Sequence, residues 1–159
     1  MDKIYFARTN EDAIIPTKRV EDGCYDIYAC FKENEMIINP HEIKLIPTGV
    51  ATSMSSEYRI SVRERGSNTK TGLIVMAGQI DSGYRGEIFV ALYNATNKPV
   101  YISKKKEIPQ GAICAPYNKA IAQLAVEFVP QVETETISYE ELLTHKSERG
   151  LGKLGSSNK

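Results

Sequence analysis

The chain has 159 residues, and its 20 Lys and Arg residues balance its 20 Asp and Glu residues, so the formal net charge is zero. A balanced charge excludes the strongly basic surface of a general nucleic-acid binder and provides no attraction to an acidic membrane surface. The length predicts one domain, large enough to bury a core without disulfides or structural metals.

Short apolar or alternating segments, each ended by turn residues, recur along the chain. In chain order they are Ile4–Phe6, Tyr25–Ala29, Met36–Ile38, Glu42–Ile46, Tyr58–Arg63, Leu73–Ala77, Glu87–Tyr93 and Ala120–Val129. Alternation with period two is typical of a half-buried strand, and frequent turns between such segments are typical of all-β domains. The pattern therefore predicts a β sandwich or barrel.

One short helix is predicted near the C-terminus, where Ser138–Glu141 fits the S-x-x-E capping box and two leucines follow. Residues 147–159 then combine three glycines and several serines with Arg149 and little that could be buried. We therefore expect a single β domain at 1–146 and a flexible glycine-rich tail at 147–159.

The cysteines and histidines are poor candidates for metal binding or nucleophilic catalysis. Cys24, Cys30 and Cys114 are odd in number and lack zinc spacing, which favours a reducing compartment, and we expect Cys24 and Cys30 to be small core residues. His41 and His145 are far apart in sequence. The N-terminus lacks the apolar core of a signal peptide, and no apolar run approaches the roughly 20 residues of a membrane span. These features predict a cytoplasmic protein.

Two polar segments are candidates for chemistry. Asp81–Gly86 places an acid, an aromatic ring and a cation in one turn between predicted strands. An aspartate is ionised at neutral pH, and one held in such a turn can accept a proton from water. Arg65–Lys70 follows a predicted strand and offers hydroxyls and two cations, as a phosphate-binding loop does. Taken alone, an ordinary polar surface loop is the simpler explanation of the second segment.

Five segments, in order, resemble the five motifs of the trimeric deoxyuridine triphosphate nucleotidohydrolase (dUTPase) family. They are Gly23–Ala29, Arg65–Ser67, Gly78–Gly86, Ala120–Leu124 and Arg149–Ser157. The third is the most specific, and the resemblance spans most of the chain, from Tyr25 to Ser157. The resemblance implies a jelly-roll-like β fold and a homotrimer, in which the glycine-rich tail crosses to a shared active site as a lid.

The resemblance also implies hydrolysis of dUTP to dUMP and pyrophosphate with Mg²⁺, which keeps uracil out of DNA and supplies dUMP for thymidylate synthesis. Asp81 would orient and deprotonate the attacking water, and Tyr84 would pack on the deoxyribose. The backbone around Gly78 and Ile80 would read uracil, and Asp26 would hold the waters around Mg²⁺. Gly66 is expected to bind the substrate, and the residues expected to bind its phosphates are Arg65, Ser67, Gln123, Arg149, Gly152, Ser156 and Ser157.

Three positions depart from the family pattern. Gly66 separates Arg65 from Ser67, although the family usually has serine directly after the arginine. Gln79 stands where an aliphatic residue is usual. Leu154 stands where an aromatic ring stacks on the base, so it can cover uracil by apolar contact but lacks a stacking contribution of about 0.5–1.5 kcal/mol.

Two alternatives remain open at this stage. The homologous dCTP deaminases carry a catalytic glutamate five residues after the glycine that corresponds to Gly86, where this chain has Ala91, and they tend to have tryptophan in place of Tyr84. A regulatory or binding protein with little turnover could also use the same scaffold. In the dUTPase interpretation, the partners are dUTP and two further copies of the chain, with neither a nucleic acid nor a membrane.

Overall fold

The computed structural model describes residues 3–152 and is built mostly of short strands. The strands are β1 (Tyr5–Arg8), β2 (Cys24–Ile27), β3 (Glu35–Ile38), β4 (Ile43–Pro47), β5 (Val50–Ser53), β6 (Tyr58–Arg63), β7 (Leu73–Val75), β8 (Gln79–Ile80), β9 (Phe89–Asn94), β10 (Val100–Ser103), β11 (Ile113–Pro116) and β12 (Ala122–Phe128). The helices are the 3-10 helix η1 (Gly66–Lys70) and the helix α1 (Tyr139–Thr144). The all-β class with one short helix near the C-terminus is therefore confirmed.

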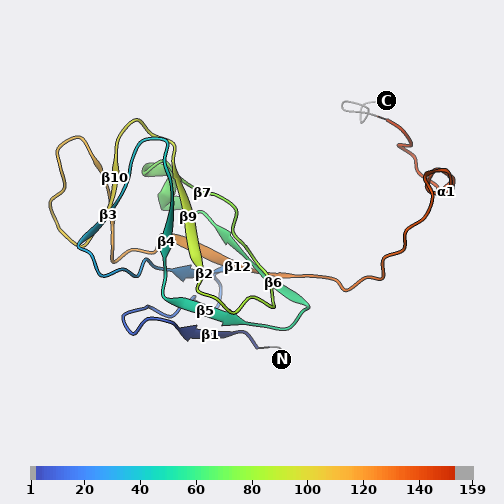
Figure 1. Cartoon of the computed structure of the whole chain (residues 1–159), viewed down its shortest axis with the longest axis horizontal. Helices are drawn as coiled ribbons and strands as arrows, with labels where there is room; N and C mark the ends of the chain where they lie inside the picture. Colours follow the sequence, from blue (N-terminus) through green and yellow to red (C-terminus); the bar gives the residue numbers. More distant parts are fainter. Residues whose placement is uncertain (1–2, 153–159) are drawn as a thin grey trace.

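The strands form four small sheets that wrap around one core (Figure 1). The largest has the order β2-β12-β6-β8, and a second has the order β4-β9-β7. The others have the orders β11-β10-β3 and β1-β5. All paired strands run antiparallel except β10 and β11. Neighbouring strands are often distant in sequence, which brings β2, β6 and β12 to one site.

Alternate side chains of these strands build the core. On β9, Val90 and Leu92 are fully buried while Phe89 at the start of the strand is exposed, as the period-two pattern predicts. Ile60 of β6 and Leu124 of β12 are also fully buried and meet the same core cluster. The catalytic candidates thus lie on or beside strands whose opposite faces are fixed by packing.

Several strands were not predicted, and their surroundings explain why. β10 is a four-residue run between Pro99 and a lysine cluster, and its partners are the non-local strands β3 and β11. The strand expected from Glu87 begins two residues later, because the Glu87 carboxylate instead accepts hydrogen bonds from the N–H groups of Thr48 (3.0 Å) and Gly49 (2.8 Å). Tertiary partners, rather than local pattern, set these boundaries.

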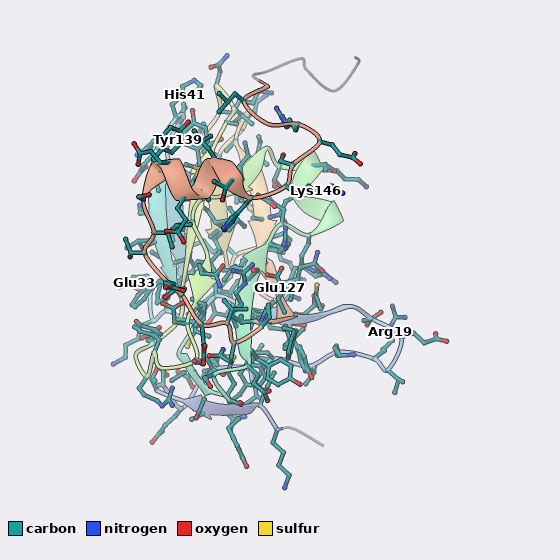
Figure 2. All side chains as sticks on the ribbon, turned by 90° about the vertical axis from the view of Figure 1, so that its right-hand side faces the viewer. Arg19, Glu33, His41, Glu127, Tyr139 and Lys146 are labelled. Atoms are coloured by element: carbon teal, nitrogen blue, oxygen red, sulfur yellow. The ribbon has the colours of Figure 1, made fainter. Side chains whose placement is uncertain are left out.

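Beyond β12 the chain leaves the body as an extended arm, defined here as residues 129–152 (Figure 1). The helix α1 lies on this arm, and Figure 2 shows it across the face turned toward the viewer. The Ser138 hydroxyl accepts a hydrogen bond from the Glu141 N–H at 3.1 Å, which confirms the predicted cap. No residue of α1 is buried within the described chain. Between residues 3 and 152, no helix has the length and apolar character needed to cross a membrane.

Candidate active site

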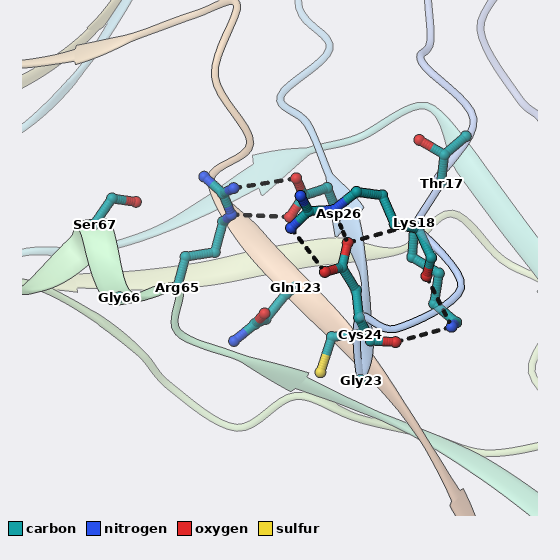
Figure 3. A pocket seen from close by; sticks show the side chains of 11 residues that line it. Thr17, Lys18, Gly23, Cys24, Asp26, Arg65, Gly66, Ser67 and Gln123 are labelled. Carbon is teal, nitrogen blue, oxygen red and sulfur yellow. Dashed lines mark hydrogen bonds and ion pairs between the residues drawn. The ribbon is translucent and has the colours of Figure 1, made fainter.

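Five of the predicted site residues line one polar cavity of about 550 Å³ (Figure 3). Asp26 comes from β2 and Gln123 from β12, where the two residues are direct antiparallel partners. Arg65, Gly66 and Ser67 come from the turn that leaves β6 and opens η1. Three segments that are distant in sequence therefore meet where the sheet β2-β12-β6 ends.

The centre of this cavity is an ion pair between Arg65 and Asp26. The Arg65 Nε donates to one carboxylate oxygen at 2.9 Å, and its Nη2 donates to the other at 3.1 Å. Both side chains are about one-third exposed, at 29% and 33%. A two-point guanidinium–carboxylate contact fixes orientation as well as charge. The two groups expected to serve the phosphates and the metal therefore neutralise each other when no ligand is bound.

The other two side chains of the cavity are held by backbone contacts. The Gln123 amide donates to the carbonyl of Glu64 at 2.7 Å, directly before Arg65. Ser67 lies in η1, which is anchored by the buried Asn68 through a 3.2 Å hydrogen bond from its amide to the carbonyl of Ile121. The glycine between Arg65 and Ser67 therefore does not remove the serine from the cavity.

Sequence reasoning missed the loop on the other side of this cavity. Its lining residues include Thr17, Lys18, Arg19, Asp22, Gly23 and Cys24. The available signal was the basic pair Lys18-Arg19, which is separated by three residues from the Gly23–Ala29 segment. Our prediction that Cys24 belongs to the core was wrong, because alternate residues of β2 share a face and Cys24 therefore faces the cavity with Asp26.

The prediction that Cys30 is a small core residue is confirmed. It lies beyond the end of β2, is buried, and packs with Ala13 and Val50. Burial raises the pKa of the Cys30 thiol, so the unreactive protonated form is favoured.

A second group of predicted residues lies in the segment between β7 and β9. Ile80 belongs to β8 and pairs with Ile60 of β6, so its backbone is fixed against the large sheet. Ala77 and Gly78 precede it with φ angles of 61° and 109°, in the left-handed region. A Cβ on Gly78 would lie 2.9 Å from the Cβ of Val62, so only glycine fits here. This close approach aligns the backbone that is expected to read uracil.

Asp81 and Tyr84 occupy one turn directly after β8. The Tyr84 N–H donates to the Asp81 carbonyl at 3.1 Å, and the Tyr84 hydroxyl donates to the carbonyl of Glu87 at 2.9 Å. A Cβ on Gly86 would lie only 2.4 Å from the Tyr84 oxygen. Gly86 therefore leaves room for the Tyr84 ring, and Tyr84 remains 44% exposed for a ligand.

The third group lies on the arm. The Arg149 Nε donates to the Gly152 carbonyl at 3.1 Å, and the Gly152 N–H donates to the Arg149 carbonyl at 3.0 Å, which closes a turn. Leu154, Ser156 and Ser157 lie outside the described residues.

One chain does not bring these three groups together. Among the described residues, those that line the cavity include Asp26 and Arg65 but not Asp81, Tyr84 or Arg149. β2, β6 and β12 gather the first group, whereas Asp81 follows β8 at the edge of the same sheet. The arm continues from β12 and projects outward from the body (Figure 1). If all the predicted residues act together, Asp81, Tyr84 and Arg149 must therefore reach this cavity from other copies of the chain.

The cavity offers few protein ligands to a metal ion. Within residues 3–152, no cluster of three or more His, Cys, Asp or Glu side chains is arranged to hold a metal ion. Mg²⁺ does not require such a cluster, because it keeps several waters and binds through one or two carboxylates together with substrate phosphates. Asp26, a carboxylate in a polar cavity beside an arginine and a serine, fits that kind of binding.

The family model and the curated relatives that match this chain all describe the same family. The family model described as dUTPase matches residues 10–158. A deoxyuridine 5′-triphosphate nucleotidohydrolase from Nautilia profundicola is 34% identical over 161 residues, which cover 99% of both chains. An enzyme of the same name from Caldanaerobacter subterraneus is 34% identical over 133 residues, covering 82% of this chain and 80% of the relative.

Solved structures share the fold. The dUTPase of Staphylococcus bacteriophage 80alpha, solved with dUpNHpp, has a TM-score of 0.78 at 24% identity and covers 99% of both chains. A mutant dUTPase of the S. aureus phage phi11, described with a structural Mg(II) ion, has a TM-score of 0.69 at 22% identity, with coverage of 85% of this chain and 96% of that one. These likenesses confirm the jelly-roll-like fold.

Proposed function

Since the chain belongs to the dUTPase family, we propose that it hydrolyses dUTP to dUMP and pyrophosphate, keeping uracil out of DNA and supplying dUMP for thymidylate synthesis. The observation that carries this proposal is the cavity in which Asp26, Arg65, Ser67 and Gln123 converge. It offers a cation, a hydroxyl and an amide to phosphate oxygens, and a carboxylate to a hydrated cation.

Asp81 is the general base. The oxygen of the attacking water forms a bond to the α-phosphorus, and a proton of the water passes to the Asp81 carboxylate. The bond between the α-phosphorus and the oxygen that bridges it to the β-phosphate breaks, and pyrophosphate leaves. The hydrogen-bonded turn supports this role, because it holds Asp81 in place before the substrate arrives. Tyr84 packs its exposed ring on the deoxyribose and leaves no room for a 2′-hydroxyl.

The phosphates are held by Arg65, Ser67 and Gln123, and by Arg149 from an arm. When bound, Mg²⁺ neutralises phosphate charge and orients the leaving group. Asp26 holds the waters of that ion, and Arg65 is thereby free to turn toward a phosphate. Positioning and charge neutralisation are the main requirements of phosphoryl transfer, so the reaction needs no protein nucleophile, and Cys24 has no role in it although it lines the cavity.

Each site is completed by two further copies of the chain in a homotrimer. Support comes from the outer face of the sheet β4-β9-β7, which exposes a continuous apolar surface where β4 and β9 pair. Its exposed large side chains are Ile43, Leu45, Ile74 and Phe89. Such a patch on a soluble protein is typical of an interface. The projecting arm, with no buried residue in α1, supplies a segment that can reach a neighbouring subunit.

The deaminase alternative lacks its carboxylate. Ala91 lies on β9 opposite Leu45 of β4, among apolar side chains. No group at that position can activate water against a cytosine ring.

A cytoplasmic location is proposed on the chemistry of the cysteines, since Cys24, Cys30 and Cys114 are all free thiols.

Release of pyrophosphate from dUTP with Mg²⁺ tests this proposal. The wild-type chain is expected to turn over dUTP and to release no ammonia from dCTP. Asp81→Asn keeps the shape of the side chain and should lower kcat by roughly 10²–10⁴-fold with little change in the affinity for dUpNHpp. Near wild-type turnover in that variant would remove Asp81 from its role, and inactivity of the wild-type chain would overturn the function.

A further inference from the structure

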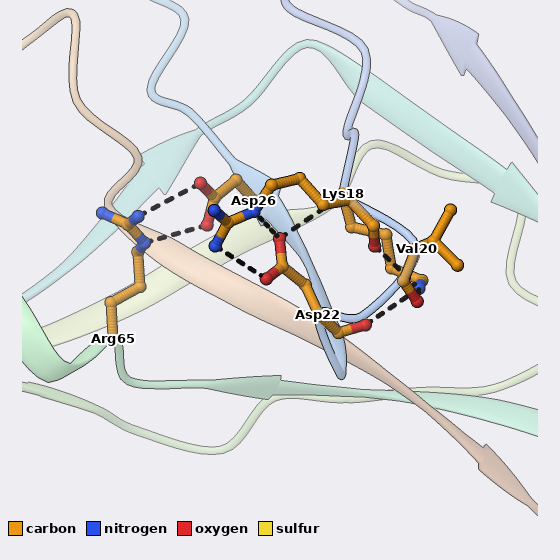
Figure 4. A network of polar contacts seen from close by, with 6 residues as sticks. Lys18, Val20, Asp22, Asp26 and Arg65 are labelled. Carbon is orange, nitrogen blue, oxygen red and sulfur yellow. Dashed lines mark hydrogen bonds and ion pairs between the residues drawn. The ribbon is translucent and has the colours of Figure 1, made fainter.

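A second guanidinium–carboxylate pair lies in the same cavity as Arg65 and Asp26. The Arg19 Nη2 donates to one Asp22 oxygen at 2.9 Å, and its Nε donates to the other at 3.0 Å. The Arg19 side chain is nevertheless 88% exposed, whereas that of Asp22 is 36% exposed. Arg19 thus lies at the open side of the cavity and is held back by its neighbour. Figure 4 shows the polar network that contains both pairs.

The loop that carries Arg19 is built to keep its shape. The Lys18 ammonium donates to three carbonyls of its own loop, those of Arg19 (3.2 Å), Val20 (3.4 Å) and Asp22 (2.8 Å). The Asp26 N–H donates to the Thr17 carbonyl at 3.0 Å, which joins the base of the loop to β2. The loop is therefore fixed to the residue that would serve the metal, and Lys18 is occupied with bracing it.

The Arg19 guanidinium, unlike the Lys18 ammonium, is bonded to a carboxylate and not to the backbone of the loop. This pairing raises the pKa of Arg19 through the hydrogen bond and charge of Asp22, with a smaller contribution from Asp26. The pKa of Asp22 is lowered, chiefly by its hydrogen bond with Arg19. Arg19 and Asp22 line the same cavity as Asp26 and Arg65, which places Arg19 beside the ligand-binding centre.

We propose that Arg19 is a second phosphate-binding arginine, which Asp22 holds in reserve and which moves to the triphosphate when the nucleotide binds. This inference rests on the proposed function. Replacing Asp22 by a phosphate as the partner of Arg19 costs little free energy, because an exposed ion pair contributes little to stability. In return, the guanidinium binds phosphate oxygens through two parallel charge-assisted hydrogen bonds. Asp22 prevents the unliganded cavity from presenting two unpaired arginines, since Asp26 neutralises the other.

Binding of dUpNHpp with Mg²⁺, measured by calorimetry, tests the assignment. Arg19→Ala should raise the Kd about tenfold, and Arg19→Lys should recover part of the loss because a point charge remains. Asp22→Asn should lower the Kd, because it removes a competing carboxylate but keeps an acceptor for the Arg19 N–H. A purely structural loop would instead be weakened by the Asp22→Asn change, and weaker binding in that variant would overturn the proposal.

Two controls separate charge, fold and function. Arg59→Ala removes another exposed, ion-paired arginine, bonded to Glu127 at 2.9 Å on the outer face of β6, and should leave the Kd unchanged. Deoxyuridine, which has no phosphate, should bind Arg19→Ala and wild type equally. Equal weakening with deoxyuridine and dUpNHpp, or an unchanged dUpNHpp Kd in Arg19→Ala, would refute the role of Arg19. Failure of the wild-type chain to bind dUpNHpp would instead refute the proposed function itself.

Discussion

Replacing Gly86 by alanine adds one methyl group, and the structure shows what that group would meet. The new Cβ would lie 2.4 Å from the Tyr84 oxygen and 2.6 Å from the adjacent ring carbon. Ordinary contact between carbon atoms begins at about 3.5 Å, so the ring must retreat by about 1 Å. The Tyr84 ring is the movable partner, because its oxygen is at the far end of an exposed side chain.

The expected cost follows from the bond that this movement breaks. The hydrogen bond from Tyr84 to the Glu87 carbonyl, 2.9 Å long, would be lost. One such bond contributes about 1 kcal/mol, which for a chain of this size lowers Tm by about 2–4 °C. The fold should survive, and the larger effect should be on the sugar preference, since the ring that excludes a 2′-hydroxyl has been displaced.

The assay compares the kcat/KM ratio of dUTP to UTP in Gly86→Ala and in Gly83→Ala. The alanine at position 83 is a matched control in the same turn, because its Cβ would have no neighbour within 4 Å. Gly86→Ala should lower the ratio, and Gly83→Ala should not. Equal ratios and equal Tm values in the two variants would refute the view that Gly86 positions the ring of Tyr84.

Three further predictions concern the sheet, the metal and the tail. Hydrogen bonds from Arg63, Ser61 and Arg59 lower the pKa of Glu127 from 4.5 to about 2, so Glu127 stabilises the fold above pH 4.5 and loses this effect as pH falls toward 2. Glu127→Gln should therefore lower Tm at neutral pH and have little effect near pH 2; a pH-independent difference would contradict this. Asp26→Asn should raise the Mg²⁺ concentration for half-maximal activity by about tenfold or more, and an unchanged Mg²⁺ titration would exclude the role of Asp26. A chain ending at Lys146 should keep near-normal thermal stability but hydrolyse dUTP very slowly, and full activity would show that the tail is not a lid.

The sequence was most informative where a strand has one solvent-exposed face and one buried face. Tyr58–Arg63 was predicted with the bounds that β6 has, because its side chains alternate between core and surface. The helix after Ser138 was predicted because its cap is local. Both features depend on residues within one short segment, so no knowledge of the tertiary structure was needed.

The parts that escaped prediction depend on contacts between distant segments. The alternation on β2 predicts that Cys24 and Asp26 share a face, but it does not say whether that face is core or cavity. The loop of Lys18 and Arg19 resembles any exposed basic loop until the fold places it on the same cavity as Gly66 and Ser67 of η1. Likewise, the separation of Asp81 from the Asp26 cavity follows from sheet order, which pattern alone does not specify.

The division of the site between subunits is tested most directly by mixing two inactive variants, Asp81→Asn and Arg65→Ala. If each site takes Asp81 from one subunit and Arg65 from another, equal amounts of the two chains assembling at random, parent trimers included, give both intact groups in one half times one half, or about one quarter, of all sites. Co-expressed chains, with mixed assembly verified by native mass spectrometry, should therefore recover about one quarter of the wild-type rate of pyrophosphate release. Mixed trimers no more active than their parents would contradict a site shared between subunits.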